Sequence, residues 1–179
     1  MKTKNTPSFQ FSPLAKTRFF LFSLSVFCLL STSLMSCTKT STAEQDKKDD
    51  DAITSYLSKD SINAIKTSSG LYYYVDSVGT GMQVSANNTV YMKYKGYLLD
   101  GTVFDKDTIG AYITLPNTNK ELTSKEWTIK GLQEGIPKFK VGGKGKLFIP
   151  SKLGYGTEAI GKIPANSVLI FEVEVIEIK

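Results

Sequence analysis

The pattern of apolar and polar positions changes along the chain and divides it into four segments. Residues 19–30 form a compact apolar run, and residues 38–51 contain one alanine and no larger apolar residue. Residues 52–66 place apolar side chains near helical spacing, whereas beyond Ser68 they alternate with a period of two. Because these periods are typical of helices and strands, the pattern predicts a short helix followed by a sheet-forming domain over residues 69–179.

The polar segment over residues 37–51 is predicted to be a disordered tether, because it cannot bury enough apolar surface to offset the entropy lost on ordering. Residues 52–68 are predicted to form a short amphipathic helix, with Asp49–Asp51 able to cap its start. Its apolar positions are Ile53, Tyr56, Leu57, Ile62 and Ile65. Such a helix could pad the domain or pair two chains, and padding is the favoured interpretation.

Beyond residue 68, aromatic and β-branched residues lie between turn signals. The predicted strands are residues 71–75, 89–98, 102–105, 111–115, 144–150 and 168–179. One short helix is predicted where Leu132, Gly135, Ile136 and Phe139 form an apolar stripe, and Gly142 and Gly143 supply its stop. The predicted fold class is therefore α+β, an antiparallel sheet wrapped over a short α-helix.

Alternation also predicts which side chains face the interior of the sheet. In the strand over residues 168–179, Phe171, Val173 and Val175 face one way, and Glu172 and Glu174 face the other. In the strand over residues 89–98, Tyr94 shares one face with Val90 and Met92.

Composition and charge narrow the possible functions. The 179 residues are 41% hydrophobic and 22% charged, as in foldable globular proteins. The net charge of +5 is concentrated in residues 1–36, and the remainder carries 18 Lys and Arg against 17 Asp and Glu, which argues against a nucleic-acid partner. The chain contains no His, so His-based triads, His general bases and zinc sites with His ligands are excluded. Its two cysteines are Cys28 and Cys37, so the predicted domain has no thiol nucleophile.

Residues 1–36 have the order of a secretory signal peptide: a basic start, the apolar run and a small-residue end. The run is too short for a comfortable spanning helix, which needs about 20 residues. The ending Leu34-Met35-Ser36-Cys37 resembles the bacterial lipobox, whose cysteine is acylated and becomes the new N-terminus. Cys37 is therefore predicted to be lipidated, which would anchor an exported protein to a membrane on its periplasmic or cell-surface side. A plain signal peptide with an incidental cysteine and an uncleaved anchor are the alternatives.

A series of short motifs follows the predicted strands and turns of the domain in order. They are Tyr94-Lys95-Gly96, Leu99-Asp100-Gly101-Thr102-Val103-Phe104-Asp105, Gly131-Leu132-Gln133-Glu134-Gly135, Val141-Gly142-Gly143-Lys144, Leu147-Phe148-Ile149-Pro150, Leu153-Gly154-Tyr155-Gly156 and Ile163-Pro164-Ala165-Asn166-Ser167. Each motif alone is weak, but together and in this order they resemble the FK506-binding-protein (FKBP) type of peptidyl-prolyl cis-trans isomerase. The resemblance covers residues 70–179 and implies an FKBP-like fold and isomerase activity, with no metal and no cofactor.

The resemblance also implies the residues of a proline-binding pocket. They are Tyr94, Phe104, Asp105, Ile129, Leu132, Tyr155 and Phe171, with Ile163 contacting the substrate from the loop before the last strand. The rings of Tyr94, Phe104 and Phe171 would line the pocket. Leu132 would form its floor and Ile129 its side wall. Asp105 would orient the Tyr94 hydroxyl or face a substrate carbonyl, and the Ile129 N–H and the Tyr155 hydroxyl would donate hydrogen bonds to peptide carbonyls.

The residue patterns themselves leave alternatives for several of these positions. Tyr94 could be ordinary packing, Asp105 could cap a turn, and Phe171 would be core in any β protein. The sequence also departs from the family in three places. The floor position, often Trp, is Leu132, and the stretch from Asp105 to Leu132 is several residues longer than in minimal members, with the extra residues around 116–126. The loop between Tyr155 and Ile163 is about one residue short and lacks the family's common Pro. Catalytic strength and peptide specificity therefore do not follow from the resemblance.

This set of residues is suited to catalysing rotation about a peptide bond. An Xaa-Pro bond isomerises over a barrier of roughly 18–20 kcal/mol without breaking a covalent bond, so a catalyst needs no nucleophile. An apolar pocket destabilises the planar amide, which water solvates better, relative to the twisted one. The predicted function is therefore isomerisation of Xaa-Pro segments in unfolded or partly folded exported proteins, with macrolides as candidate inhibitors. The alternatives are a non-catalytic peptide-binding or chaperone module using the same cavity, and a cell-surface interaction protein whose binding loop is residues 116–126.

Overall fold

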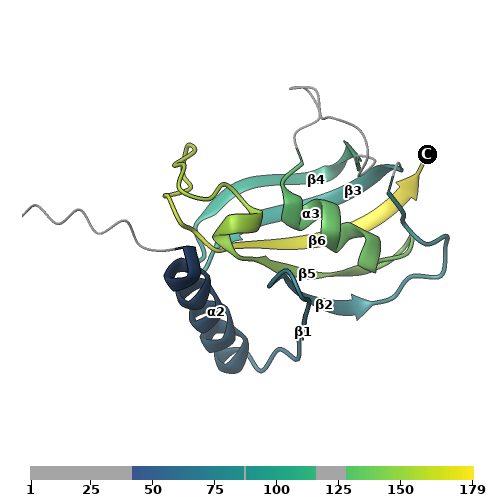
Figure 1. Cartoon of the computed structure of the whole chain (residues 1–179). Coiled ribbons are helices and arrows are strands. Elements are labelled where there is room, and N and C mark those ends of the chain that lie inside the picture. Colours follow the sequence, from purple (N-terminus) through teal and green to yellow (C-terminus); the bar gives the residue numbers. More distant parts are fainter. Residues whose placement is uncertain (1–41, 87, 116–127) are drawn as a thin grey trace, which may run out of the picture. The chain divides into compact units, whose positions relative to one another are not determined.

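Six antiparallel strands form one sheet in the computed structural model of the chain, which describes residues 42–86, 88–115 and 128–179. The strands are β1 (Ile65–Lys66), β2 (Tyr72–Ser77), β3 (Thr89–Leu98), β4 (Val103–Thr114), β5 (Lys144–Ile149) and β6 (Leu169–Ile178). Their order across the sheet is β1-β2-β5-β6-β3-β4, so the C-terminal strand pairs with β5 on one side and β3 on the other (Figure 1).

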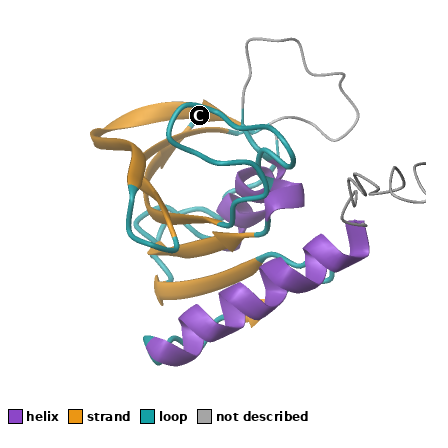
Figure 2. Cartoon of the chain, turned by 90° about the vertical axis from the view of Figure 1, so that its left-hand side faces the viewer, coloured by secondary structure: helices purple, strands orange, loops and turns teal. Residues whose placement is uncertain are grey.

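One helix packs on each face of this sheet. Helix α3 (Lys130–Gly135), followed by the 3-10 turn η1 (Ile136–Lys138), lies on the concave face, which we call the inner face. The longer helix α2 (Thr42–Lys59) lies against the opposite, outer face (Figure 2). This arrangement confirms the predicted α+β class and the sheet wrapped over a short helix.

Alternation along the strands assigns side chains to two separate apolar clusters. In β5, Leu147 and Ile149 belong to the cluster under α3, whereas Phe148 belongs to the cluster under α2. In β6, Phe171 faces α3 and Ile170 faces α2. The period of two therefore predicts the two faces correctly.

The inner core depends on a close approach between α3 and β5. A Cβ atom at Gly131 would lie 2.4 Å from the Ile149 side chain, and one at Gly135 would lie 2.5 Å from the Leu147 side chain. Since the two glycines are four residues apart, they share one face of the helix and let it rest directly on the strand. The burial of these side chains confirms the predicted apolar stripe: Leu132 is 7% exposed, and Ile136 and Phe139 are fully buried. Its helical part ends at Lys138, earlier than the predicted stop at Gly142, which instead adopts a φ of +82° in the turn before β5.

The prediction of a disordered tether over residues 37–51 is wrong for residues 42–51, which form the first turns of α2. The carboxylate of Asp49, 2% exposed, accepts hydrogen bonds from the backbone N–H and the hydroxyl of Ser151, both at 2.7 Å. Asp50 accepts hydrogen bonds from the Tyr72 hydroxyl, at 2.8 Å, and from the Lys66 ammonium group. The acidic residues therefore lie within the helix and do not cap its start. Polar partners outside the segment, between 16 and 102 residues along the chain, hold it in place, and an argument from apolar content does not detect them.

The predicted end of this helix at residue 68 is also wrong. Helix α2 ends at Lys59, and Ser61 adopts a φ of +54° that turns the chain back. Ile65, predicted to lie on the apolar stripe, instead pairs with Tyr73 in the edge strand β1 and is 58% exposed. Ile62 and Ile65 continue the helical spacing of apolar residues, although both lie beyond the end of the helix.

Strand β4 joins two segments that were predicted separately, residues 102–105 and 111–115. A register shift relative to β3 occurs between them, and the Asp107 carboxylate accepts hydrogen bonds there from the N–H groups of Ile109 and Gly110, at 2.9 and 2.8 Å. Because this side chain satisfies the backbone donors at the irregularity, the strand passes through it without ending.

The predicted signal peptide over residues 1–36, the predicted lipidation at Cys37 and the predicted binding loop over residues 116–126 lie outside the described residues. Within the part of the chain that the structure describes, no helix is both long enough and apolar enough to cross a membrane.

Candidate active site

Three aromatic rings from three strands meet on the inner face of the sheet. The Tyr94 and Phe171 ring centroids lie 6.2 Å apart, and the Phe104 ring meets Phe171 at 5.5 Å with an interplanar angle of 71°. Both geometries are typical of attractive aromatic contacts. Phe171 is 5% exposed, while Tyr94 and Phe104 are only partly buried. We call Tyr94, Phe104 and Phe171 the inner aromatic cluster.

Gly96 is what allows these rings to meet. It pairs with Phe171 on one side and with Asp105 on the other. A Cβ atom at Gly96 would lie 2.5 Å from the Phe104 ring and 3.1 Å from the Phe171 ring. Any larger residue would therefore push the two phenylalanines apart.

Asp105 orients the hydroxyl of Tyr94. The Tyr94 Oη–H donates a hydrogen bond of 2.9 Å to Asp105 Oδ2, which is the first of the two arrangements expected for this carboxylate. Turn capping, the alternative for Asp105, is instead performed by Asp100, whose carboxylate accepts the backbone N–H of Thr102 at 2.8 Å in the turn before β4.

Burial and the nearby Asp105 carboxylate raise the pKa of both tyrosines of the site above the ordinary value. Burial, and after it the hydrogen bond to Asp105, raises the pKa of Tyr94 to about 12. Burial, and then the charge of Asp105, also raises the pKa of Tyr155. Both phenols therefore remain hydrogen-bond donors over the physiological range.

The remaining predicted residues join the same apolar cluster. Leu132 and Ile163 are buried in it, at 7% and 5% exposure, and Ile129 and Tyr155 pack against it while remaining partly exposed. These predicted residues thus belong to the same inner-face apolar cluster as the three rings. Asp105, which is exposed, lies at its edge through the contact with Tyr94.

Two hydrogen-bond donors at this cluster have no partner within the described residues. The Ile129 carbonyl accepts the first helical N–H groups of α3, from Leu132 at 3.0 Å and Gln133 at 3.1 Å. Its own N–H donates to no group among residues 42–86, 88–115 and 128–179. The Tyr155 hydroxyl likewise finds no acceptor in that part of the chain. These are the two donors that the resemblance assigned to substrate carbonyls.

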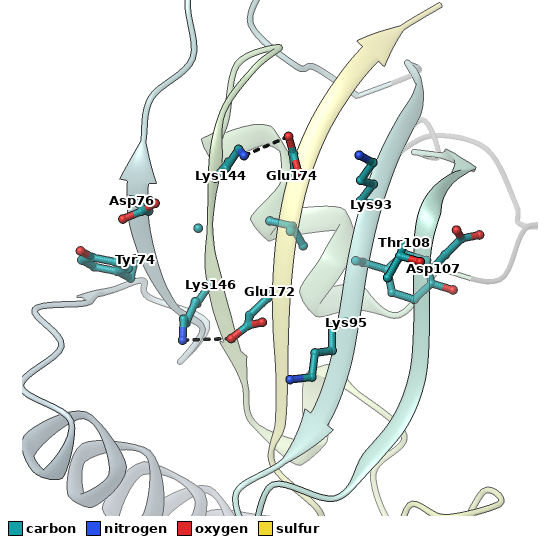
Figure 3. A pocket seen from close by; sticks show the side chains of 13 residues that line it. Tyr74, Asp76, Lys93, Lys95, Asp107, Thr108, Lys144, Lys146, Glu172 and Glu174 are labelled. Carbon is teal, nitrogen blue, oxygen red and sulfur yellow. Dashed lines mark ion pairs between the residues drawn. The ribbon is translucent and has the colours of Figure 1, made fainter.

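A hollow of about 560 Å³ opens on the outer face of the sheet, and its chemistry is different (Figure 3). Lysines and carboxylates dominate its lining, and two ion pairs cross it: Lys144–Glu174 at 3.1 Å and Lys146–Glu172 at 3.0 Å. Tyr94 also borders this hollow, but no second ring of the inner aromatic cluster does, and its charged groups would hold water beside a bound amide. We therefore assign the candidate active site to the inner aromatic cluster and its neighbours.

The described residues contain no group of three or more His, Cys, Asp or Glu side chains placed to hold a metal ion. The candidate site itself presents aromatic rings, aliphatic side chains, one carboxylate and the two donors. This set can bind an apolar group and align a peptide beside it.

Comparison with known proteins identifies the family of the chain. The family model described as FKBP-type peptidyl-prolyl cis-trans isomerase matches residues 81–176, more than half of the chain. The chain therefore belongs to this family, as its motifs predicted.

Named relatives cover the same region. The chain is 45% identical over 116 residues to the FKBP-type peptidyl-prolyl cis-trans isomerase FkpA of Buchnera aphidicola subsp. Schizaphis graminum, covering 64% of this chain and 43% of the relative. It is 39% identical over 117 residues to FkpA of Escherichia coli K12, covering 64% of this chain and 40% of the relative. The chain thus spans less than half the length of these curated relatives.

Solved structures support the fold. The crystal structure of FkpA from Escherichia coli aligns with a TM-score of 0.59 and 27% identity, covering 95% of this chain and 74% of that chain. A peptidyl-prolyl cis-trans isomerase from Pseudomonas syringae aligns with a TM-score of 0.63 and 26% identity, covering 79% and 98%.

Three residues with structural roles near the site were not predicted to have them: Gly96, Asp49 and Ser151. Gly96 stood within a quoted motif, and an alternating strand interrupted by a glycine was the available signal for a close approach of side chains. Asp49 and Ser151 gave a weaker signal: Asp49 precedes the buried Ile53 and Leu57 at intervals of four on one helical stripe.

Proposed function

We propose that the protein is a peptidyl-prolyl cis-trans isomerase that binds proline at the inner aromatic cluster. The observation that carries this proposal is the meeting of Tyr94, Phe104 and Phe171 in the apolar cluster against which Ile129 and Tyr155 also pack. A half-exposed aromatic cluster of this kind suits a small apolar ring such as that of proline.

The proposed mechanism depends on how the cluster and water differ in solvating the planar and the twisted amide. Rotation about the Xaa-Pro bond passes through a twisted amide, which has lost its resonance and its strong charge separation. Aromatic and aliphatic walls solvate the planar amide poorly, so they raise its free energy more than that of the twisted form. The Ile129 N–H and the Tyr155 hydroxyl hold the flanking peptide while the bond turns. Each 1.4 kcal/mol gained in this way accelerates rotation about tenfold.

A protease-coupled assay on a series of short Xaa-Pro peptides tests this proposal with the full chain. We expect acceleration over the uncatalysed rate, and inhibition by a macrolide that occupies the same cluster. The double variant Phe104→Ala, Asp105→Ala should lose at least 100-fold in kcat/KM, since it removes one wall and the partner of Tyr94. A double variant as active as the wild type would remove the pocket assignment.

A second candidate function is a non-catalytic peptide-binding or chaperone module that uses the same cluster. Leu132 favours it, because a buried leucine at the floor offers proline less flat contact area than the indole common in the family. In that case, peptides would bind with micromolar or weaker affinity and cis–trans exchange would proceed at its uncatalysed rate. Peptide binding measured together with turnover separates the two functions.

We further propose that the protein is exported and anchored by lipid at Cys37, so that its substrates are Xaa-Pro segments of exported proteins. The basic start, the apolar run over residues 19–30 and the small residues before Cys37 support this. Because one acyl chain binds a membrane only marginally, stable anchoring requires more than one. Mass spectrometry of the N-terminal peptide from a bacterial host should find an acylated Cys37, and Cys37→Ser should release the protein from membranes. A Cys37→Ser variant that stays bound would contradict the anchor.

A further inference from the structure

The structure contains one buried carboxylate that the proposed mechanism does not use. Asp49 on helix α2 is 2% exposed, and its partner Ser151, the first residue of the 3-10 turn η2 (Ser151–Leu153) after β5, is 3% exposed. They are the two buried polar residues of the described chain. Asp49 Oδ2 accepts the N–H and the hydroxyl of Ser151, and Asp49 Oδ1 accepts Gln45 Nε2, all at 2.7 Å.

Packing of helix α2 against the sheet does not by itself require the Asp49 carboxylate. Asp49 lies on the same stripe of α2 as Ile53 and Leu57, which insert into the outer cluster. An apolar side chain on this stripe would avoid the free-energy cost of burying a charge, which only well-placed hydrogen bonds offset. A carboxylate at this position therefore fixes a particular geometry at Ser151.

Ser151 transmits that geometry to the candidate active site. Its carbonyl oxygen accepts the N–H groups of Gly154, at 2.9 Å, and Gly156, at 2.8 Å. These glycines flank Tyr155 on both sides, and Gly156 adopts a φ of +60°. The Gly156 carbonyl in turn accepts the N–H of Asn166 at 2.7 Å, which ties the turn to the end of the loop that carries Ile163. Glycine-flanked backbone is intrinsically free to move, so the position of Tyr155 depends on this anchor.

We propose that Asp49 is a positioning residue for the candidate active site: through Ser151 it fixes the glycine-flanked turn that carries Tyr155. The effect on catalysis rests on the proposed isomerase function, whereas the effect on the turn does not. Helix α2 is then a part of the catalytic domain, and its connection to the site runs through two consecutive sets of hydrogen bonds.

The experiment compares Asp49→Ala with a matched control on the same helix, in the full chain. Asp46→Ala removes a carboxylate that also contacts the turn after β5, through an exposed ion pair with Lys152 at 2.7 Å, but leaves Ser151 anchored. Two quantities are measured for each variant: amide hydrogen exchange at Gly154 and Gly156, relative to amides of β6, and kcat/KM on an Xaa-Pro peptide.

We expect Asp49→Ala to accelerate exchange at the two glycines at least tenfold relative to β6 and to lower kcat/KM about tenfold, because small misplacements of a binding group are costly. Asp46→Ala should change either quantity less than twofold. In a Tyr155→Phe background, Asp49→Ala should cost less than a further twofold in kcat/KM, since the positioned hydroxyl is already absent. A merely structural role would lower kcat/KM equally in both backgrounds.

Several outcomes overturn the proposal. Exchange at the glycines that does not change, or that rises only as much as in β6, shows that Asp49 does not hold the turn. If Asp49→Ala does not fold, Ser151→Ala is measured instead, because it keeps the backbone contact to Asp49 and removes only the hydroxyl. An unchanged exchange rate at Gly154 and Gly156 in Ser151→Ala also overturns the proposal, and an increase of about threefold supports it. A wild-type protein without isomerase activity refutes the proposed function, while the exchange rates still test the anchor.

Discussion

Each face of the sheet carries a group of aromatic side chains, and the two groups differ in how far they are buried. On the outer face, Tyr72, Tyr97 and Phe148 are at most 7% exposed beneath helix α2, and both tyrosine hydroxyls donate hydrogen bonds, to Asp50 and Glu172. On the inner face, Tyr94 and Phe104 remain partly exposed. Aromatic content alone therefore does not mark a binding site. The difference is whether another part of the chain covers the rings and satisfies the polar groups near them.

The largest expected effect concerns the covered face. Phe148→Ala removes a fully buried ring from the outer cluster, so we expect the free energy of unfolding to fall by about 3–5 kcal/mol. Denaturant titration measures this loss. The kcat/KM of the fraction that remains folded should stay within about threefold of the wild type, and a loss of 100-fold would show that the outer cluster participates in catalysis.

The next effect concerns the inner face, where we expect a substitution to reduce activity more than stability. Phe104→Ala removes a partly exposed ring, so its stability loss should be smaller than that of Phe148→Ala, about 1–2 kcal/mol. Its kcat/KM should fall about 30- to 100-fold, because proline loses an aromatic wall. The same two measurements apply, and a variant that loses stability without losing activity would place proline elsewhere.

A finer comparison uses two tyrosines of β3 that lie on opposite faces. Tyr97→Phe removes a buried hydroxyl that donates to Glu172 Oε1 at 3.0 Å, so we expect a loss of about 1–2 kcal/mol in stability and little change in turnover. Tyr94→Phe removes the hydroxyl that Asp105 orients, so it should lower kcat/KM about three- to tenfold with less than about 0.5 kcal/mol lost in stability. Equal effects of the two substitutions on turnover would contradict the distinction between the faces.

The smallest effect is a change in proton affinity. Asp105→Asn removes a negative charge beside Tyr94, so the pKa of Tyr94 should fall from about 12 while staying above its ordinary value of about 10, because burial is the larger cause of the shift. NMR of tyrosine labelled at Cζ follows this titration. The sign for stability is also defined: the folded pKa exceeds the unfolded one, so the contribution of Tyr94 is complete below pH 10 and is lost as the pH rises to about 12. An unchanged pKa in Asp105→Asn would show that the hydrogen bond between these side chains does not form in solution.

The sequence predicted the features that depend on local periodicity. The alternation of Phe171, Val173 and Val175 with two glutamates gave the correct inner face of β6, and strand β3 begins and ends where it was predicted. The motifs of the family predicted pocket residues whose apolar members share one inner-face cluster in the structure. Both kinds of inference use information that lies within a few residues.

The features that the sequence analysis missed depend on contacts between distant residues. The segment over 42–51 looked disordered because its partners, among them Ser151 and Lys152, lie about a hundred residues further along the chain. The exchange of Ile65 from a helical stripe to an edge strand likewise depends on pairing with Tyr73. Tertiary contacts override local composition at such positions, and composition contains no record of them.

The most direct measurement of where proline binds is a titration of the isotope-labelled full chain with a short Xaa-Pro peptide, followed by NMR. The account predicts chemical-shift changes at the rings of Tyr94, Phe104 and Phe171 and at the Ile129 amide, together with exchange between the cis and trans signals of the peptide. Changes confined to the charged hollow around Lys93, Lys95, Lys144 and Lys146, or none at the three rings, would contradict it.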